Sequence, residues 1–246
     1  MRQERISTGS YDLNKFLFGG YETDIITTIY GPAGCGKTNF CILVAASQAK
    51  KGNKVIYMDS EGGFSVDRVK QILEKNNQET EKVLQNILLL KPISFAEQEQ
   101  DFEILLKHVK KGEVSLIIVD SMVMLYRLEL GDAIKSGEDE KIKEVNRKLA
   151  GQLRKLNEIA RKDNIPVIVT NQVYSEFVNS KDFISQKERP VSMVGGDLLK
   201  YWSKCLIELT NNKGKKTLIL RKHRSLPEKE IQFEIVNEGI KRKGWI

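Results

Sequence analysis

The chain has 246 residues, of which 40 are basic and 33 acidic, giving a net charge of +7 at pH 7. This length suits one α/β domain with a substantial core. No apolar run of about eighteen residues is present and no apolar signal follows the N-terminus, so we expect neither a membrane span nor export. Cys35, Cys41 and Cys205 form no CxxC pair, which favours free thiols in a reducing cytoplasm over disulfides or zinc.

The first predicted elements are a strand over residues 25–30 and a helix over residues 40–49. Between them the pattern of Gly, four residues and Gly-Lys-Ser/Thr is complete, in the order Gly31, Pro32, Ala33, Gly34, Cys35, Gly36, Lys37, Thr38. Glycines let backbone N–H groups converge on phosphate oxygens, and a helix N-terminus adds positive potential. Lys37 is expected to reach the β- and γ-phosphates and the Thr38 hydroxyl to bind Mg²⁺. The chain is therefore predicted to bind a nucleoside triphosphate.

The middle of the chain alternates short apolar strands with helical patterns. Strands are predicted over residues 54–59, 87–90, 116–120 and 166–170, and helices over residues 94–110 and 139–162. In the second helix the apolar positions advance by three or four residues, which places them on one face. Strands that alternate with helices indicate a mostly parallel sheet with crossover helices.

Three polar residues follow the predicted strands and could complete the nucleotide site. Asp120 ends a very apolar strand, where an aspartate commonly holds Mg²⁺ in phosphate-loop enzymes, although it could instead cap the next helix. Glu61 follows another strand end and could activate the attacking water, although a loop glutamate can also be a solvated surface group. Gln172 could place an amide near the γ-phosphate.

The C-terminal part changes in pattern and in charge. Strands over residues 205–210, 217–221 and 231–236 follow one another without helices, which predicts an antiparallel extension at the sheet edge. Residues 200–246 hold 12 basic against 5 acidic residues and supply the whole excess charge. A polyanion partner explains this asymmetry, and so does a solvated lysine-rich surface. With no repeat or linker, residues 1–246 are predicted to form a single domain.

Several motifs, taken in order, resemble the RecA/RadA recombinase family nearly end to end. Besides the phosphate loop they comprise residues 6–10 (ISTGS), 59–64 (DSEGGF), 119–121 (VDS), 169–173 (VTNQV), 195–197 (GGD), 226–228 (LPE) and 237–240 (NEGI). Among the branches of this family the chain is most similar to an archaeal paralogue of RadA. The resemblance implies a RecA-like P-loop NTPase core, with helices on both faces of a twisted, mostly parallel sheet.

The resemblance also implies roles for individual residues. Lys37 and Thr38 take the phosphate and magnesium roles for ATP, with Asp120 as the second ligand on the magnesium side. Glu61 becomes the water-activating glutamate and Gln172 the γ-phosphate sensor that couples nucleotide state to DNA. Arg68 falls where the family places an arginine that stacks on adenine, a role that suits a planar guanidinium; an exposed helical charge is the alternative.

Three departures from RadA affect the expected activity. Only about six residues precede the opening Ser7-Thr8-Gly9, which leaves no room here for RadA's helical DNA-binding domain or its filament-forming hook. The segment after Asp120 keeps Arg127 of the first DNA loop but continues with acidic residues, which repel phosphate. Tyr201 replaces a histidine that responds to nucleotide across the subunit interface. Filament formation and the trans-acting half of the ATPase are therefore expected to be weak.

Two regions are predicted to contact DNA. A second loop over residues 174–190 interleaves aromatic residues with Lys181, Lys187 and Arg189, a combination that suits single strands, although a flexible loop covering the site is the alternative. A basic cluster contains Arg221, Lys222 and Arg224, and strand alternation would aim Lys222 and Arg224 at one face. A lysine-protected hairpin edge explains this cluster equally well.

These observations predict an accessory protein of DNA repair and homologous recombination. The resemblance implies that it binds ATP with Mg²⁺, binds DNA without sequence preference, has very weak ATPase activity and performs no strand exchange by itself. It also implies cooperation with a RadA-type recombinase and with a Holliday-junction nuclease. An active DNA-dependent recombinase and a KaiC-like signalling ATPase of the same superfamily are the alternatives.

Overall fold

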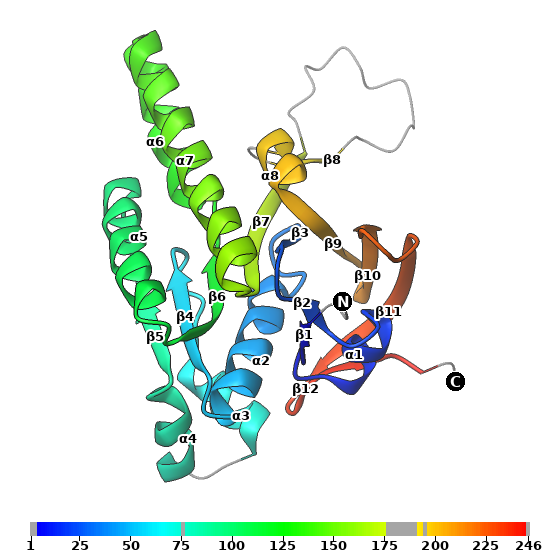
Figure 1. Ribbon diagram of the computed structural model, residues 1–246. Helices are drawn as coiled ribbons and strands as arrows, with labels where there is room; N and C mark the ends of the chain where they lie inside the picture. Colours follow the sequence, from blue (N-terminus) through cyan, green and yellow to red (C-terminus); the bar gives the residue numbers. More distant parts are fainter. Residues whose placement is uncertain (1–3, 75–76, 176–190, 194–195, 245–246) are drawn as a thin grey trace, which may run out of the picture.

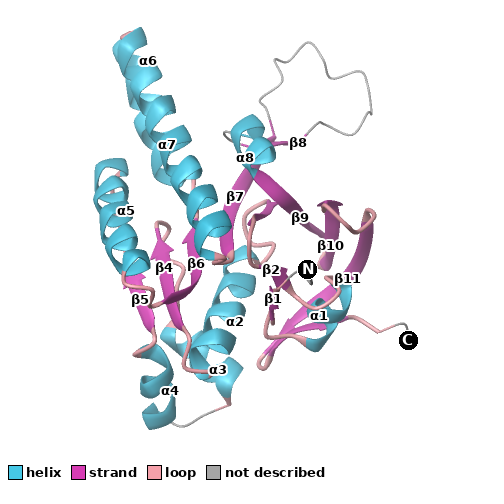
Figure 2. Cartoon of the chain, in the orientation of Figure 1, coloured by secondary structure: helices cyan, strands magenta, loops and turns pink. Residues whose placement is uncertain are grey.

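The computed structural model describes residues 4–74, 77–175, 191–193 and 196–244 (Figures 1 and 2). Its helices are α1 (Tyr11–Phe16), α2 (Lys37–Lys50), α3 (Val66–Leu73), α4 (Asn77–Leu84), α5 (Phe95–Lys110), α6 (Met124–Ser136), α7 (Asp139–Asp163) and α8 (Gly196–Trp202). Its strands are β1 (Arg5–Ile6), β2 (Tyr21–Glu22), β3 (Ile26–Gly31), β4 (Lys54–Asp59), β5 (Ile87–Leu90), β6 (Val114–Asp120), β7 (Val167–Ser175), β8 (Val191–Met193), β9 (Ser203–Asn212), β10 (Lys215–Lys222), β11 (Lys229–Val236) and β12 (Gly239–Arg242).

The main sheet has the strand order β12-β11-β10-β9-β3-β7-β6-β4-β5, with β8 paired to β7 outside this path. All neighbours from β9 to β5 are parallel, and those from β9 to β12 are antiparallel. This confirms the predicted parallel sheet with an antiparallel C-terminal extension. The register pairs Gly31 with Gln172 and Asp59 with Asp120. The carboxyl ends of β3, β7, β4 and β6 therefore meet at one edge of the sheet.

Helices cover both faces of the sheet, as predicted, and each face has its own core. In β6, Leu116 and Ile118 pack in the cluster that contains α2, whereas Ile117 and Val119 pack in the cluster that contains α5 and α7. Side chains of a strand alternate between faces, so a strand covered on both sides must be apolar throughout. Figure 1 shows α2 on one side of the sheet and α5, α6 and α7 on the other.

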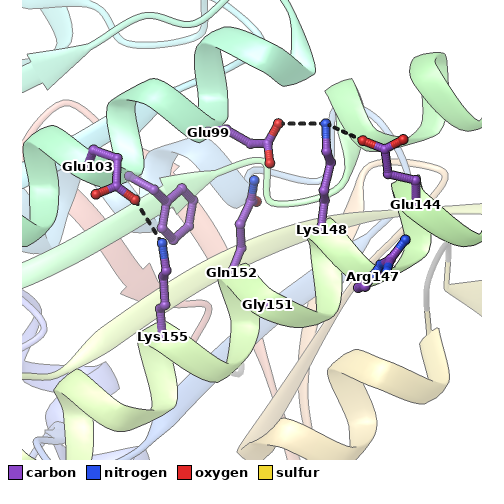
Figure 3. A pocket seen from close by; sticks show the side chains of 9 residues that line it. Glu99, Glu103, Glu144, Arg147, Lys148, Gly151, Gln152 and Lys155 are labelled. Atoms are coloured by element: carbon purple, nitrogen blue, oxygen red, sulfur yellow. Dashed lines mark hydrogen bonds and ion pairs between the residues drawn. The ribbon is translucent and has the colours of Figure 1, made fainter.

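The long helix α7 packs beside α5 along an apolar seam edged by ion pairs (Figure 3). Phe102 of α5 is buried there at 1% exposure, and the buried Gln98 amide donates to Gln152 Oε1 at 2.7 Å. Lys148 Nζ lies 3.1 Å from Glu99, and Lys155 Nζ lies 2.9 Å from Glu103. Such exposed pairs contribute little to stability, so burial of Phe102 and the α7 apolar face holds the two helices together.

The sequence predicted a DNA-binding loop after Asp120, and this prediction is wrong in its secondary structure. Residues that follow Asp120 form helix α6 rather than a loop, and Arg127 is an exposed residue on that helix. Gly137 ends α6 with a φ of 71°, a left-handed conformation that suits glycine at a helix end. The helices α1, α3 and α4 were also not predicted. These helices have only 6, 8 and 8 residues, too few for an apolar pattern to repeat over several turns.

Candidate nucleotide-binding site

The phosphate loop joins β3 to the N-terminus of α2, as predicted. Gly36 is the N-cap of α2 and has a φ of 113°. A Cβ there would approach Ile235 Cδ1 to 2.8 Å, and a Cβ at Gly31 would lie 2.1 Å from the backbone oxygen of Leu209. Only glycine fits at both positions. The loop thus reaches a helix N-terminus in a backbone conformation suited to binding an anion.

Lys37 lies inside the loop that it terminates. The residue is only 7% exposed, and its Nζ donates to the backbone oxygens of Gly31 at 2.9 Å and Pro32 at 3.0 Å. An ammonium group has three donors and a full positive charge, so it is attracted more strongly to an anionic phosphate oxygen than to a neutral carbonyl oxygen. A phosphate oxygen in the loop would therefore compete effectively for this side chain.

Lys216 is a second cation at the loop, and sequence reasoning missed its place there. It belongs to β10, and its Nζ donates to the backbone oxygen of Gly34 at 2.9 Å. In the sequence, Lys216 is only one of the basic residues of the positively charged C-terminal part. Its partner is 182 positions away, so no local pattern could have revealed this contact.

Asp120 ends β6 beneath the loop and is 2% exposed. Its carboxylate accepts hydrogen bonds from the Tyr57 hydroxyl at 2.9 Å and the Thr170 hydroxyl at 2.5 Å. Burial raises the pKa of Asp120, and hydrogen bonds from Thr170, Thr38 and Tyr57 oppose that rise. The predicted pair of Thr38 and Asp120 is thus brought together. Neighbouring strands fix the carboxylate through Tyr57 and Thr170, two residues that sequence reasoning missed.

The Thr38 and Asp120 oxygens fit the chemistry of Mg²⁺. This ion prefers oxygen ligands, and it is commonly held by one or two protein groups together with water and substrate phosphates. Within the described ranges no cluster of three or more His, Cys, Asp and Glu side chains could hold a metal alone. A magnesium ion held by Thr38 and Asp120 would therefore take its other ligands from phosphate and water.

Glu61 and Gln172, predicted as the water-activating glutamate and the γ-phosphate sensor, are in direct contact. Gln172 Nε2, in β7, donates to Glu61 Oε2 at 2.7 Å. The loop carrying Glu61 is fixed by Asp59, whose carboxylate accepts from the N–H groups of Gly63 and Phe64, both at 3.0 Å. Asp59 is buried and ends β4. Its position at the end of a strand could have marked Asp59 as a residue of the site. The side chain of Asp59 holds the loop that carries Glu61.

Arg68 lies on α3, and its guanidinium bridges α2 and the turn between β11 and β12. Its Nε donates to Asn39 Oδ1 at 2.8 Å, and its Nη2 donates to the backbone oxygen of Val236 at 2.8 Å. Partial burial lowers the pKa of Arg68. Guanidinium hydrogen bonds lie in the plane of the group, so this arrangement is compatible with stacking on its face. Adenine stacking remains a prediction.

Among the predicted DNA-binding residues that the structure describes, Arg127 lies on α6, whereas Arg221 and Lys222 lie at the end of β10. Lys181, Lys187 and Arg189 lie outside the described residues. Arg221 makes ion pairs with Glu208 at 2.6 Å and Glu228 at 2.5 Å. The positive charge of Arg221 is therefore balanced by carboxylates of the same hairpin region. This arrangement favours the alternative interpretation of the basic cluster, a charged hairpin edge, for this residue.

The predicted alternation of Lys222 and Arg224 along one strand is wrong, because β10 ends at Lys222. Lys222 Nζ donates to the backbone oxygens of Lys200 at 2.8 Å and Ser203 at 2.9 Å. Arg224 Nε donates to the buried Glu22 at 2.9 Å, and its Nη1 donates to Asp24 at 2.8 Å. Glu22 and Asp24, about 200 positions away in the sequence, thus neutralise the charge of Arg224. In the sequence this residue is seen only beside other cations.

We expect Arg224→Ala to lower the free energy of unfolding by about 1 to 3 kcal/mol, because it removes a cation from the buried Glu22 carboxylate. The affinity for DNA should change little. Urea unfolding and a DNA titration of the same variant would test this, with Arg147→Ala, an exposed position on α7, as control. Weakened DNA binding at unchanged stability would instead assign Arg224 to DNA.

Among the residues that the structure describes, no helix has the length and apolar character needed to cross a bilayer.

Comparison of the sequence with known proteins identifies the family to which the chain belongs. Residues 2–243 match the Rad51 family. The chain is 40% identical over 228 residues to the DNA repair and recombination protein RadB of Methanocaldococcus jannaschii, covering 93% of this chain and 98% of that protein. It is 38% identical over 232 residues to RadB of Methanosphaera stadtmanae, with coverage of 93% and 92%. RadB of Methanobrevibacter smithii is 36% identical over 241 residues, with coverage of 96% and 95%.

Proposed function

Because the chain belongs to the Rad51 family, as a RadB-type paralogue of the RecA and RadA recombinases, we propose that it is an accessory protein of DNA repair and homologous recombination. It binds ATP with Mg²⁺, binds DNA without sequence preference and hydrolyses ATP very slowly. The observation that carries this proposal is the grouping of the phosphate loop, Asp120 and the Glu61–Gln172 contact at one edge of the sheet.

Each residue of this edge has a part in handling the triphosphate. Lys37 exchanges its two carbonyl acceptors for phosphate oxygens, and Thr38 and Asp120 are the residues that would hold the magnesium ion. When bound, that ion neutralises negative charge on the phosphates. Glu61 orients the attacking water and accepts its proton. Gln172 turns its amide from Glu61 to the γ-phosphate, so β7 responds to the presence of that phosphate.

Slow turnover is consistent with the identity of Tyr201. Phosphoryl transfer depends on positive groups at the developing charge, and a neighbouring protomer can supply them. A histidine at this position could be protonated near neutral pH, whereas a tyrosine hydroxyl is neutral there. A neighbouring copy of this chain would therefore bring no positive charge to the phosphate through Tyr201.

DNA binding is proposed to use Arg127, Lys181, Lys187, Arg189 and Lys222, with smaller contributions from the ion-paired Arg221 and Arg224. We expect the affinity for two unrelated DNA sequences to be equal and to fall linearly on a logarithmic salt scale, because phosphate contacts release counterions. Salt-titrated binding of single- and double-stranded DNA, with and without Mg-ATP, checks this. A strong preference for one sequence, or no dependence on salt, would contradict it.

A RadA-type recombinase and a Holliday-junction nuclease are the proposed protein partners. Strand exchange with purified components tests the accessory role. The chain alone is expected to give no product, and its addition should change the rate obtained with RadA. Strand exchange by the chain alone would identify an active recombinase instead.

A further inference from the structure

A cavity of about 690 Å³ lies at the other end of the sheet from the phosphate loop. It is lined by residues from the start of β3, the end of α7, the junction of α8 and β9, and the end of β10. Ser203, at the start of β9, is paired in register with Ile26, the first residue of β3. The phosphate loop follows the other end of that strand, roughly 17 Å away at about 3.3 Å per residue. The two sites are therefore separate.

The cavity is positively charged. Its basic lining residues are Arg161, Lys204, Lys222 and Arg224, and Asp24 is its one acidic lining residue among those described. Asp24 is already engaged by Arg224, since Arg224 Nη1 donates to it at 2.8 Å. The hydrogen bond from Arg224 and, to a smaller extent, the charge of Arg161 lower the pKa of Asp24. Among the described lining residues four cations thus share one carboxylate.

Lys222 is fixed at the wall of the cavity by the chain around it. Two of its three ammonium donors are used by the backbone oxygens of Lys200 and Ser203. Partial burial and the nearby Lys204 lower the pKa of Lys222, as expected where positive charge is not balanced. An anion in the cavity would relieve this repulsion and could accept the remaining N–H.

An exposed aromatic residue stands at the same place. Tyr201 is 70% exposed, and its ring meets Trp202 edge to face, with centroids 5.3 Å apart at 87°. Lys204 Nζ lies 6.0 Å from the centre of the Tyr201 ring. Cations that follow phosphates beside an open aromatic face are the combination that binds single-stranded nucleic acid.

We propose that this cavity is a second phosphate-binding site, in which Arg161, Lys204 and Lys222 bind the phosphates of a nucleotide chain and Tyr201 stacks on a base. The inference rests on the proposed DNA binding and gives it a location. A free polyphosphate shares the phosphate chemistry but lacks a base, so the role of Tyr201 distinguishes the two ligands.

The test uses Lys37→Ala as background, so that the phosphate loop does not compete for phosphate. A labelled oligothymidylate of about 15 nucleotides and inorganic tripolyphosphate are titrated separately. The double variant Arg161→Ala/Lys204→Ala should weaken oligonucleotide binding and reduce the logarithmic salt slope by about 1.4, the loss of two phosphate contacts on a single strand. Lys141→Ala/Lys143→Ala, exposed on α7, removes equal charge and should leave both quantities unchanged.

Tyr201→Ala should weaken oligonucleotide binding roughly tenfold without changing the salt slope, because stacking carries no counterion effect. Tyr201→Phe should retain the affinity. Tripolyphosphate binding that depends on Arg161 and Lys204, with oligonucleotide binding insensitive to all these changes, would support the phosphate site and identify free polyphosphate as its ligand.

Two further outcomes separate this inference from the proposed function. If the unsubstituted chain binds DNA, but Arg161→Ala/Lys204→Ala changes the binding of neither the oligonucleotide nor tripolyphosphate, the cavity is not a phosphate-binding site. The proposed DNA binding would then be retained, at another surface. If the unsubstituted chain binds no DNA, that part of the proposed function fails. Tripolyphosphate binding then decides the inference alone, and its absence from the cavity overturns it.

Discussion

Replacing Lys37 by alanine is expected to lower ATP affinity by roughly 10²- to 10³-fold, the effect of removing one partner from a desolvated charge pair. The ammonium lies within the loop, where it now donates to the backbone oxygens of Gly31 and Pro32. Alanine leaves the β- and γ-phosphates without this cation. Calorimetric titration with Mg-ATP and with a non-hydrolysable analogue measures the loss.

The control for this experiment is Lys216→Ala. Lys216 donates to the backbone oxygen of Gly34 from outside the loop and is exposed in that contact. We expect a much smaller loss of affinity from its removal than from Lys37→Ala. Equal ATP affinity in the Lys37→Ala variant and the original chain would mean that the nucleotide binds elsewhere.

Glu61→Gln is expected to lower ATP turnover by roughly 10²- to 10³-fold, within the usual contribution of a general base, while ATP affinity stays unchanged. A glutamine side chain can still accept the hydrogen bond that Gln172 Nε2 now donates to Glu61 at 2.7 Å. It cannot accept a proton from water. Phosphate release under single-turnover conditions measures the effect on chemistry, and calorimetry measures binding.

Since the original turnover is expected to be slow, contaminating ATPase activity must be excluded. The double variant Lys37→Ala/Glu61→Gln, purified in the same way, provides that baseline. If Glu61→Gln turns over ATP as fast as the original chain and well above this baseline, then Glu61 is not the base.

The parts of the site that lie at strand ends could be predicted from the sequence. The phosphate loop has a fixed pattern between a strand and a helix. Asp120 and Glu61 each follow an apolar segment that is buried on both faces. Parallel strands align their carboxyl ends, so placing these residues on strands was enough to predict their proximity. The register of β4 with β6 and of β3 with β7 confirms that arrangement.

Features that depend on distant partners could not be predicted. Arg224 reads as part of a basic cluster until Glu22 and Asp24, about 200 positions earlier, are seen to neutralise it. Lys216 reads as surface charge until its contact with Gly34 is seen. Helix α6 was missed because the resemblance to a recombinase suggested a loop there. The cavity beside Tyr201 likewise joins four elements that only the fold brings together.

A crystal structure with Mg²⁺ and a non-hydrolysable ATP analogue would test the central claim most directly. We predict phosphates enclosed by the turn between β3 and α2, with Lys37 moved from the Gly31 and Pro32 oxygens onto them and the metal between Thr38 and Asp120. The Gln172 amide should then face the γ-phosphate instead of Glu61. Nucleotide bound at another surface, with Lys37 still on its two carbonyl acceptors, would contradict the account.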